Sequence, residues 1–352
     1  MRSSNTQKQP TTACNHTLLD KHHQRESPQA VSANHPRISV VIPTFNAAAT
    51  IDACLESVLS AIESWGPADL VVLDNGSTDG TRERATVLCG ATGSVLAKPD
   101  ASIARLRNLG AAATSGPILS FIDSDCVVPP NYFETAWAVF ETTGAGAVGS
   151  LYALPPDPKW IEAVWFRMHD LSQDGPVRWL NGGNLLVRRD GFDRVGGFNE
   201  ALRTGEDVDF CERLRATGAL IYHDRRIEAV HLGNPVTFRS FFRQQRWHGL
   251  GTSLRNSRDD KPLGISLFYL IATVAALTIW LTGLSRGVDA ALLILASQLL
   301  PPALAVGYRA VQARRLVNPA AGIALYWIYF WSRLAALWSI LFGAPQLHRG
   351  RR

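Results

Sequence analysis

Short apolar runs alternate with amphipathic segments along the first third of the chain. Apolar positions recur with helical spacing over residues 48–62 and again over residues 102–115, where a glycine follows. Strands that alternate with helices predict an α/β fold with a mostly parallel sheet that is covered on both faces. The predicted strands are runs of branched and aromatic side chains too short for helices: residues 37–43, 69–74 and 118–122.

The last of these runs ends at two aspartates that stand one residue apart. Asp123 and Asp125 follow Ile122, and prolines at 129 and 130 prevent the strand from continuing inside a sheet. Open α/β sheets bind ligands at the carboxyl ends of their strands, so this pair is a candidate ligand site. The two carboxylates repel each other unless a proton or a cation lies between them, and a hard divalent ion suits oxygen ligands. A polar turn with solvated aspartates is the alternative.

Two further polar residues are expected near the same edge of the sheet. Asp74 ends the second strand, where its carboxylate can accept the N3–H of a uracil or thymine ring. An Asx turn within "DNGS" is the alternative for Asp74. Arg107 lies on a predicted helix, where it can bind phosphate or ribose oxygens or can be an ordinary solvated arginine.

A second acidic site begins at Glu206. Glu206 and Asp207 precede a new helical pattern. One of these carboxylates, held near the start of a helix, can remove a proton from an attacking hydroxyl. Thr204 and Asp207 also fit a capping box, which is the structural alternative.

Two glycines and one histidine complete the candidates from the residues alone. Gly182 and Gly183 precede a predicted strand, and a glycine turn there lets a substrate approach the backbone closely. His231 is alone on an apolar strand, where a packed histidine is more common than a ligand.

Three apolar segments follow the globular part. Residues 263–284 carry no charge and can cross a hydrocarbon core of about 30 Å at about 1.5 Å per residue. Residues 288–308 form a second predicted span. Residues 322–342 hold Arg333 in their middle, and they cross, lie in the interface or form a buried core helix. Basic residues just before residue 263 place the catalytic part in the cytoplasm.

Composition supports the same division of the 352 residues. Hydrophobic residues make up 46% and charged residues 18%, and the net charge of +5 gathers around the C-terminal apolar segments, which suits a membrane surface and not nucleic acid. Five cysteines without close spacing predict no disulfide framework or zinc site and fit a reducing cytoplasm. We predict a disordered N-terminal tail over residues 1–36 without a signal peptide, a catalytic domain over 37–255 and a membrane region over 256–352.

Eight motifs in sequence order resemble the inverting glycosyltransferases of family 2, which have the GT-A fold, a Rossmann-like fold that binds nucleotide sugars. The resemblance extends from about Ile38 to Thr252. It rests on "VVIPTFN", "VLDNGSTDGT", "ARLRNLG", "FIDSD", "NGGNLLVRR", "VGGFNE", "GEDVDFCERL" and the late His231.

The resemblance implies a role for each matching residue. Asp123 and Asp125 bind the ribose and a Mg²⁺ or Mn²⁺ ion on the diphosphate, and His231 completes the metal shell. Asp207 is the general base, with Glu206 as the next candidate. The residues implied for the nucleotide are Pro43, Thr44, Asn46, Asp74, Arg107 and Asp123. Those implied for the donor sugar or the acceptor are Asn181, Gly182, Gly183, Asn184, Arg246 and Trp247.

The implied reaction moves one sugar, with inversion, from a nucleoside diphosphate sugar to a hydroxyl of a lipid-linked or polysaccharide acceptor at the membrane. Asp74 favours UDP. Processive members embedded in membranes often carry Q-x-x-R-W, and "RQQRW" departs from it at Arg243, which argues against processive synthesis. Two alternatives are a phosphatase of the haloacid dehalogenase type with Asp123 as nucleophile, and a non-catalytic membrane-anchored protein that binds sugar nucleotides.

Overall fold

The computed structural model describes residues 35–170, 173–252, 261–283, 288–315 and 317–342. The predicted N-terminal tail lies almost wholly outside these ranges. Arg255 and Arg258, which carry the prediction of orientation, also lie outside them.

An eight-stranded sheet forms the centre of the catalytic part, in the order β3-β2-β1-β4-β8-β6-β9-β7. The first four strands in this order are parallel neighbours, which confirms the predicted mostly parallel sheet. Strand β8 runs antiparallel to both β4 and β6. The strands are β1 (Ile38–Thr44), β2 (Ala68–Asp74), β3 (Gly93–Ala97), β4 (Ile118–Ile122), β6 (Ala147–Gly149), β7 (Gly175–Pro176), β8 (Asn184–Arg188) and β9 (Ile221–His223).

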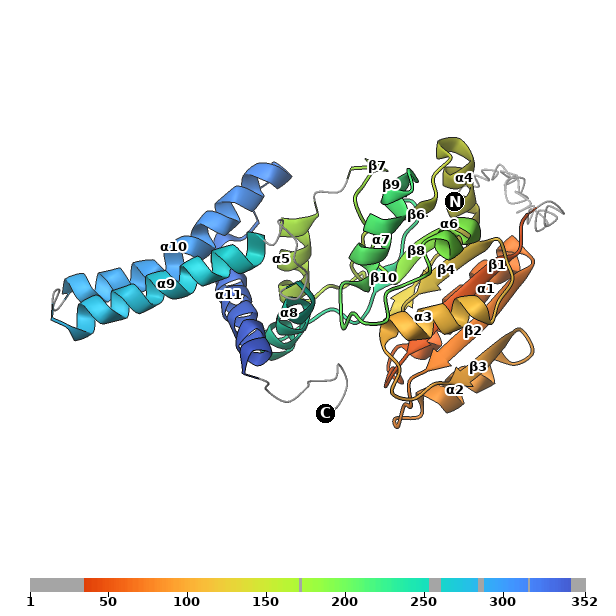
Figure 1. The fold of residues 1–352 in the computed structure, drawn as a ribbon, viewed down its shortest axis with the longest axis horizontal. Helices are drawn as coiled ribbons and strands as arrows, with labels where there is room; N and C mark the ends of the chain where they lie inside the picture. The colour runs from red at the N-terminus through yellow and green to blue at the C-terminus, as the bar shows by residue number, and fades with distance from the viewer. Residues whose placement is uncertain (1–34, 171–172, 253–260, 284–287, 316, 343–352) are drawn as a thin grey trace, which may run out of the picture. The chain divides into compact units, whose positions relative to one another are not determined.

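Helices cover both faces of this sheet (Figure 1). Val40 and Ile42 pack against one set of helices, while Val41 between them packs against the other, as successive strand residues must. The first layer contains α1 (Ile51–Trp65), α2 (Thr81–Cys89) and α4 (Tyr132–Thr143). The second layer contains α3 (Ile103–Ala112), α6 (Arg189–Arg194) and α7 (Glu206–Ala216).

Helix α3 ends at Ala112, earlier than the predicted end at Ser115. Gly116 is therefore not the residue that ends it, and Gly116 has no positive φ. A Cβ atom on Gly116 would lie 2.6 Å from the carbonyl oxygen of Arg37. The glycine is required because the chain entering β4 passes close to the start of β1.

A second, two-stranded sheet carries the late histidine. Strand β5 (Cys126–Val127) directly follows the acidic pair and pairs antiparallel with β10 (Val230–His231). His231 lies opposite Cys126 in this ladder. The short ladder therefore brings the histidine next to the aspartates that precede β5.

Four helices form the C-terminal part, and α5 of the catalytic part lies beside them (Figure 1). Ile161 and Met168 of α5 share one apolar core with Phe241, Val306 and Leu325. This core joins the catalytic part to the apolar helices. The four C-terminal helices are α8 (Phe238–Thr252), α9 (Lys261–Leu281), α10 (Val288–Ala313) and α11 (Pro319–Leu341), and helix α5 spans Trp160–His169.

Two of these helices are long and apolar enough to cross a membrane: Ala291–Ala313 within α10 and Pro319–Leu341, which is α11. The described apolar stretch of the first predicted span, Ser266–Leu281, is shorter. Two C-terminal apolar helices are therefore confirmed among the described residues, and they are the second and third predicted segments. The first predicted segment forms most of α9, and its crossing stays a prediction.

Arg333, in the middle of α11, faces protein. Its guanidinium lies over the ring of Tyr329, with 4.8 Å between Cζ and the ring centroid. A Cβ atom on Gly249 of α8 would lie 3.2 Å from Cδ of Arg333, so α8 packs closely along this side of α11. Protein contacts of this kind reduce the free energy that a buried arginine costs in an apolar helix.

Candidate active site

The ends of three neighbouring strands bring the first candidates together. Thr44 and Asp74 lie opposite each other at the ends of β1 and β2, and Asp123 follows β4 on the other side of β1. The side chain of Thr44 is 3% exposed, and its hydroxyl has no hydrogen-bond partner among the described residues. A buried polar atom without a partner is uncommon in folded proteins.

Asp74 forms the Asx turn that was its structural alternative. Its carboxylate accepts hydrogen bonds from the backbone N–H of Gly76 (3.1 Å to Oδ2) and of Ser77 (3.2 Å to Oδ2). The side chain is buried. Because a carboxylate has about four lone-pair positions, these bonds leave it able to accept from a ligand as well. Its role toward a uracil ring stays a prediction.

Asn46 connects the two loops that follow β1 and β2. Its backbone N–H donates to Oγ of Ser77, and its Oδ1 accepts from the backbone N–H of Thr78, both at 2.9 Å. Its φ of 47° is left-handed, a conformation that asparagine tolerates better than most residues. Pro43 lies buried inside β1, opposite Leu73. Both residues shape the edge where a nucleotide is predicted to bind.

Both carboxylate oxygens of Asp123 are held by side chains. Nη2 of Arg107 donates to Oδ1 at 2.8 Å, and the Tyr152 hydroxyl donates to Oδ2 at 3.1 Å. Arg107 is only 3% exposed, so the alternative of a solvated arginine is wrong. The guanidinium contacts a carboxylate, and its predicted contact with phosphate or ribose is untested by this geometry.

The same arginine distinguishes the two carboxylates at the start of α7. Nη1 of Arg107 donates to Oε1 of buried Glu206 at 2.6 Å. Asp207 is half-buried and accepts from the backbone N–H of Gly182 (3.1 Å) and of Val208 (2.8 Å). The capping box is not formed, because Gly205 is the N-cap residue and provides no side chain. Glu206 is thus an ion-pair partner, and Asp207 is the carboxylate outside that pair.

The surroundings of Asp207 raise the pKa of its carboxyl group to about 6. Burial is the main cause, and the neighbouring charge of Glu206 adds to it. Arg107 and the backbone N–H groups act in the opposite direction. A carboxylate with a raised pKa is a better proton acceptor, which suits a general base.

The two glycines before β8 leave room for side chains of the site. A Cβ atom on Gly182 would lie 2.7 Å from Nη1 of Arg107. A Cβ atom on Gly183 would lie 2.2 Å from Cγ of Asp123 and 2.5 Å from the hydroxyl oxygen of Tyr152. The glycines therefore let Arg107 and Asp123 pack against the backbone, and the predicted approach of a substrate stays a prediction.

Asn184 cannot contact a sugar, which corrects its predicted role. Its side chain is fully buried, and its Nδ2 donates to Oγ of Ser150 (2.9 Å) and to the carbonyl oxygen of Ile227 (3.0 Å). Its Oδ1 accepts from the Tyr132 hydroxyl at 2.7 Å. Asn184 joins β8 to neighbouring segments. Asn181 is half-buried at the turn before it, and its role stays a prediction.

Asp125 and His231 form the second half of the acidic edge. Nε2 of His231 lies 3.4 Å from Oδ2 of Asp125. Nδ1 of His231 lies 3.0 Å from Oδ1 of Asn234, whose Nδ2 donates to the His231 carbonyl oxygen and so fixes the orientation of the amide. Since the amide oxygen faces Nδ1, that nitrogen is the donor of this hydrogen bond, and Nε2 faces Oδ2 of Asp125.

This pair fits part of a divalent metal site. A carboxylate oxygen and an imidazole nitrogen with a fixed tautomer are metal ligands, and an outer partner such as Asn234 is typical of them. Within the described residues, however, no group of three or more His, Cys, Asp or Glu side chains could hold an ion. A metal at this edge therefore needs further ligands, for which diphosphate oxygens and water are suited.

Arg246 connects α8 to the C-terminal helices, and its predicted contact with the acceptor or the diphosphate stays a prediction. Its Nη2 donates to Oγ of Ser339 at 2.6 Å, so the side chain joins α8 to α11. Trp247 is half-buried on the same helix, and its role stays a prediction.

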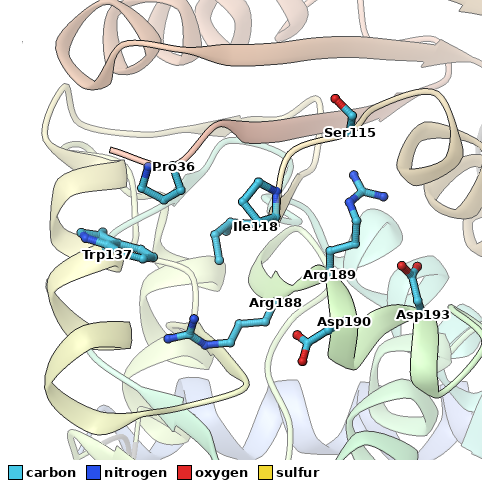
Figure 2. A pocket seen from close by; sticks show the side chains of 9 residues that line it. Pro36, Ser115, Ile118, Trp137, Arg188, Arg189, Asp190 and Asp193 are labelled. Carbon is cyan, nitrogen blue, oxygen red and sulfur yellow. The ribbon is translucent and has the colours of Figure 1, made fainter. Parts of the chain in front are cut away.

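A hollow of about 570 Å³ lies at the opposite edge of the sheet (Figure 2). Pro36, Ile118, Trp137 and Arg188 are among its lining residues, so it lies where β1 and β4 begin. Arg189, also in its lining, donates to the carbonyl oxygen of Gly116 at 2.7 Å. The hollow is separate from the strand ends that carry Thr44, Asp74 and Asp123.

Tyr152 is a site residue that the sequence did not reveal. It binds Asp123 through its hydroxyl and stacks on His231, with 4.6 Å between the ring centroids. It therefore connects the two halves of the acidic edge. It occurs in "SLYALPP", which has no motif of its own, so no local signal could have identified it.

Comparison with known proteins gives the family. Residues 118–342, more than half of the chain, match the family described as glycosyl transferase family group 2. Residues 39–196 match the family described as glycosyl transferase family 2. Both descriptions are of glycosyl transferases, which argues against the alternative of a phosphatase of the haloacid dehalogenase type.

Individual relatives agree with the family. Glycosyltransferase AglE of Haloferax volcanii is 28% identical over 207 residues, which cover 57% of this chain and 68% of AglE. Succinoglycan biosynthesis protein ExoU of Rhizobium meliloti is 30% identical over 221 residues, which cover 57% of this chain and 64% of ExoU. The chain thus spans less than two thirds of ExoU.

A solved structure shares the fold. Mannosyltransferase PcManGT from Pyrobaculum calidifontis, in complex with GDP-Man and Mn²⁺, superposes with a TM-score of 0.62. The sequence identity is 16%, and the match covers 89% of each chain. With the sheet order and the acidic edge described above, these matches establish that the chain is a glycosyltransferase and belongs to family 2.

Proposed function

We propose that the protein transfers one sugar, with inversion, from a nucleoside diphosphate sugar to an acceptor hydroxyl, with Asp207 as the general base. The observation that carries this proposal is the difference between the two carboxylates of α7, since Arg107 pairs with Glu206 and leaves Asp207 to act. Asp207 takes the proton of the acceptor hydroxyl. The acceptor oxygen then forms a bond to the anomeric carbon as the bond to the diphosphate breaks on the opposite face, which inverts that carbon.

A Mg²⁺ or Mn²⁺ ion is proposed to assist the reaction. Asp125 and His231 would hold it, supported by the 3.4 Å separation of their facing atoms and by the fixed histidine tautomer. Asp123, whose two oxygens accept from Arg107 and Tyr152, keeps lone pairs for the ribose and the metal side of the donor. When bound, the ion would neutralise negative charge that develops on the leaving nucleoside diphosphate.

The proposed donor carries UDP. Asp74 offers a carboxylate at the end of β2, and the unpaired Thr44 hydroxyl lies beside it on β1. A carboxylate accepts the N3–H that uracil and thymine present and adenine lacks. PcManGT binds GDP-Man, so a guanosine donor is the alternative that a binding measurement must test.

The proposed acceptor is lipid-linked or a polysaccharide at the membrane. Most of the exposed large apolar side chains in residues 35–252 either lie close to site residues in the sequence or contact helix α8. Trp179 precedes the Gly182 turn, and Leu232 follows His231. Trp160 and Phe238, each 48% exposed, contact each other edge to face, and Phe238 begins α8. Such a surface suits an acceptor with an apolar part, because exposed apolar patches mark interaction sites.

A screen of nucleotide sugars tests this function. Purified full-length protein, in vesicles with a membrane extract as acceptor source, is incubated with UDP, GDP and dTDP sugars, with and without Mn²⁺. We expect metal-dependent transfer from one UDP sugar, with the opposite anomeric configuration in the product by NMR. Retention of configuration, or transfer that continues in excess chelator, would overturn the proposal.

A further inference from the structure

A buried arginine connects the donor side of the site to the base side. Nη2 of Arg107 lies 2.8 Å from Oδ1 of Asp123, and Nη1 lies 2.6 Å from Oε1 of Glu206. The guanidinium of Arg107 is confined by two neighbours. It lies close to the backbone of Gly182, and its Cζ lies 5.5 Å from the centroid of the Phe198 ring. A planar guanidinium with two separate pairs of donors can hold two carboxylates at a fixed separation.

We propose that Arg107 is a positioning residue that makes Asp207, and not the adjacent Glu206, the base of the reaction. The proposal rests on the function proposed above. Two neighbouring carboxylates at one helix start would otherwise compete for the same proton. Arg107 engages Glu206 instead, because its Nη1 donates to Oε1 of that carboxylate at 2.6 Å. Within the part of the chain that the structure describes, the hydrogen bonds of Asp207 come from backbone N–H groups.

The charges around Asp207 support this assignment. Glu206, from the same helix, raises the pKa of Asp207, and Arg107, from α3, lowers it. Asp123 is bound by the other terminal nitrogen of the same guanidinium, at 2.8 Å. Arg107 therefore keeps Asp207 ionised near neutral pH while it fixes the donor-side carboxylate.

Four variants separate this role from simple packing. The pH profile of kcat/KM is measured for the wild type, Arg107→Gln, Glu206→Gln and the double variant Arg107→Gln/Glu206→Gln. We expect the acidic limb of this pH profile to move to higher pH, by about one pH unit or more, in Arg107→Gln. In Glu206→Gln we expect it to move to lower pH. In the double variant both perturbing charges are gone, so its limb should lie between those of the two single variants. Arg107→Lys keeps the charge without the fork, so its limb should stay near that of the wild type while kcat falls.

Two results would overturn the proposal. An Arg107→Gln variant that loses activity with an unmoved limb would assign Arg107 to packing alone. If Arg107→Gln does not fold, the Glu206→Gln protein is compared with the double variant. Acidic limbs at the same pH in those two proteins would reject the proposal. Failure of the underlying function is distinguishable, because it would appear in the wild type as transfer without an acidic limb.

Discussion

His231 and Asp125 lie side by side, with 3.4 Å between Nε2 and Oδ2, although they come from distant segments of the chain. The pairing of His231 with Cys126 in the β5–β10 ladder causes this arrangement. Asn234 then fixes the tautomer of the histidine ring. A histidine that seems to be a packing residue in the sequence is thereby placed as a partner of the acidic pair.

Removal of Asn234 should weaken metal binding. Asn234→Ala deletes the acceptor of Nδ1–H, so the ring loses its fixed tautomer and orientation. Outer partners of this kind typically change metal affinity by about 10- to 100-fold. Titration of transfer activity with Mn²⁺ measures the change, and we expect a higher half-saturating concentration with nearly unchanged rate at saturation.

Removal of a direct ligand should have a larger effect. Asp125→Ala is expected to abolish most transfer at any Mn²⁺ concentration, with an unchanged circular dichroism spectrum, because Asp125 lies at the edge of the sheet and outside its core. Full activity of this variant, or of the wild type in excess chelator, would reject the metal site.

The pH dependence of the wild type follows from Asp207. Its carboxyl group has a pKa raised to about 6 in the free enzyme, and only the ionised form accepts a proton. As the pH falls below about 6, kcat/KM should decrease by about tenfold per pH unit, and above it should level off. A profile that stays flat down to pH 4.5 would assign the base to a group with an ordinary carboxyl pKa.

Gly183 should not tolerate a methyl group. In Gly183→Ala the new Cβ atom would lie 2.2 Å from Cγ of Asp123, so Asp123 or the turn must move. We expect a loss of about 1–3 kcal/mol in stability and a weaker donor affinity. Gly264→Ala is the matched control, because nothing lies within 4 Å of its added Cβ atom. Equal effects of the two substitutions in thermal melts and donor titrations would contradict the close packing.

The C-terminus should lie on the cytoplasmic side. Residues 348–352 contain three arginines, and among the described residues two helices, α10 and α11, are long enough to cross, which is an even number. Cysteine labelling of Gly350→Cys in sealed vesicles measures this, with the described native cysteines all buried. Labelling from the outside would establish an odd number of spans, with residues 263–284 as the additional one.

The sequence predicts the parallel half of the fold well, because strands such as 118–122 and helices such as α1 have strong periodic patterns. Strand β8 is different, since nothing local to "NLLVRR" shows that it runs antiparallel between β4 and β6.

Asp123, Asp125 and Asp207 were identifiable because carboxylates follow strands or begin a helix. Tyr152 and the ion pair of Arg107 with Glu206 were not, because they depend on contacts between distant segments. Asn184 and Arg246 were assigned to ligands by resemblance, but their hydrogen bonds are used inside the protein.

The rate of sugar transfer by Asp207→Asn, measured together with donor binding, tests the central claim most directly. The amide keeps the shape of the side chain and cannot accept a proton. We predict that the variant binds the nucleotide sugar with near wild-type affinity and transfers it about 10²- to 10⁴-fold more slowly, whereas Glu206→Gln loses much less. An Asp207→Asn protein with near-normal turnover would contradict the account and place the base elsewhere.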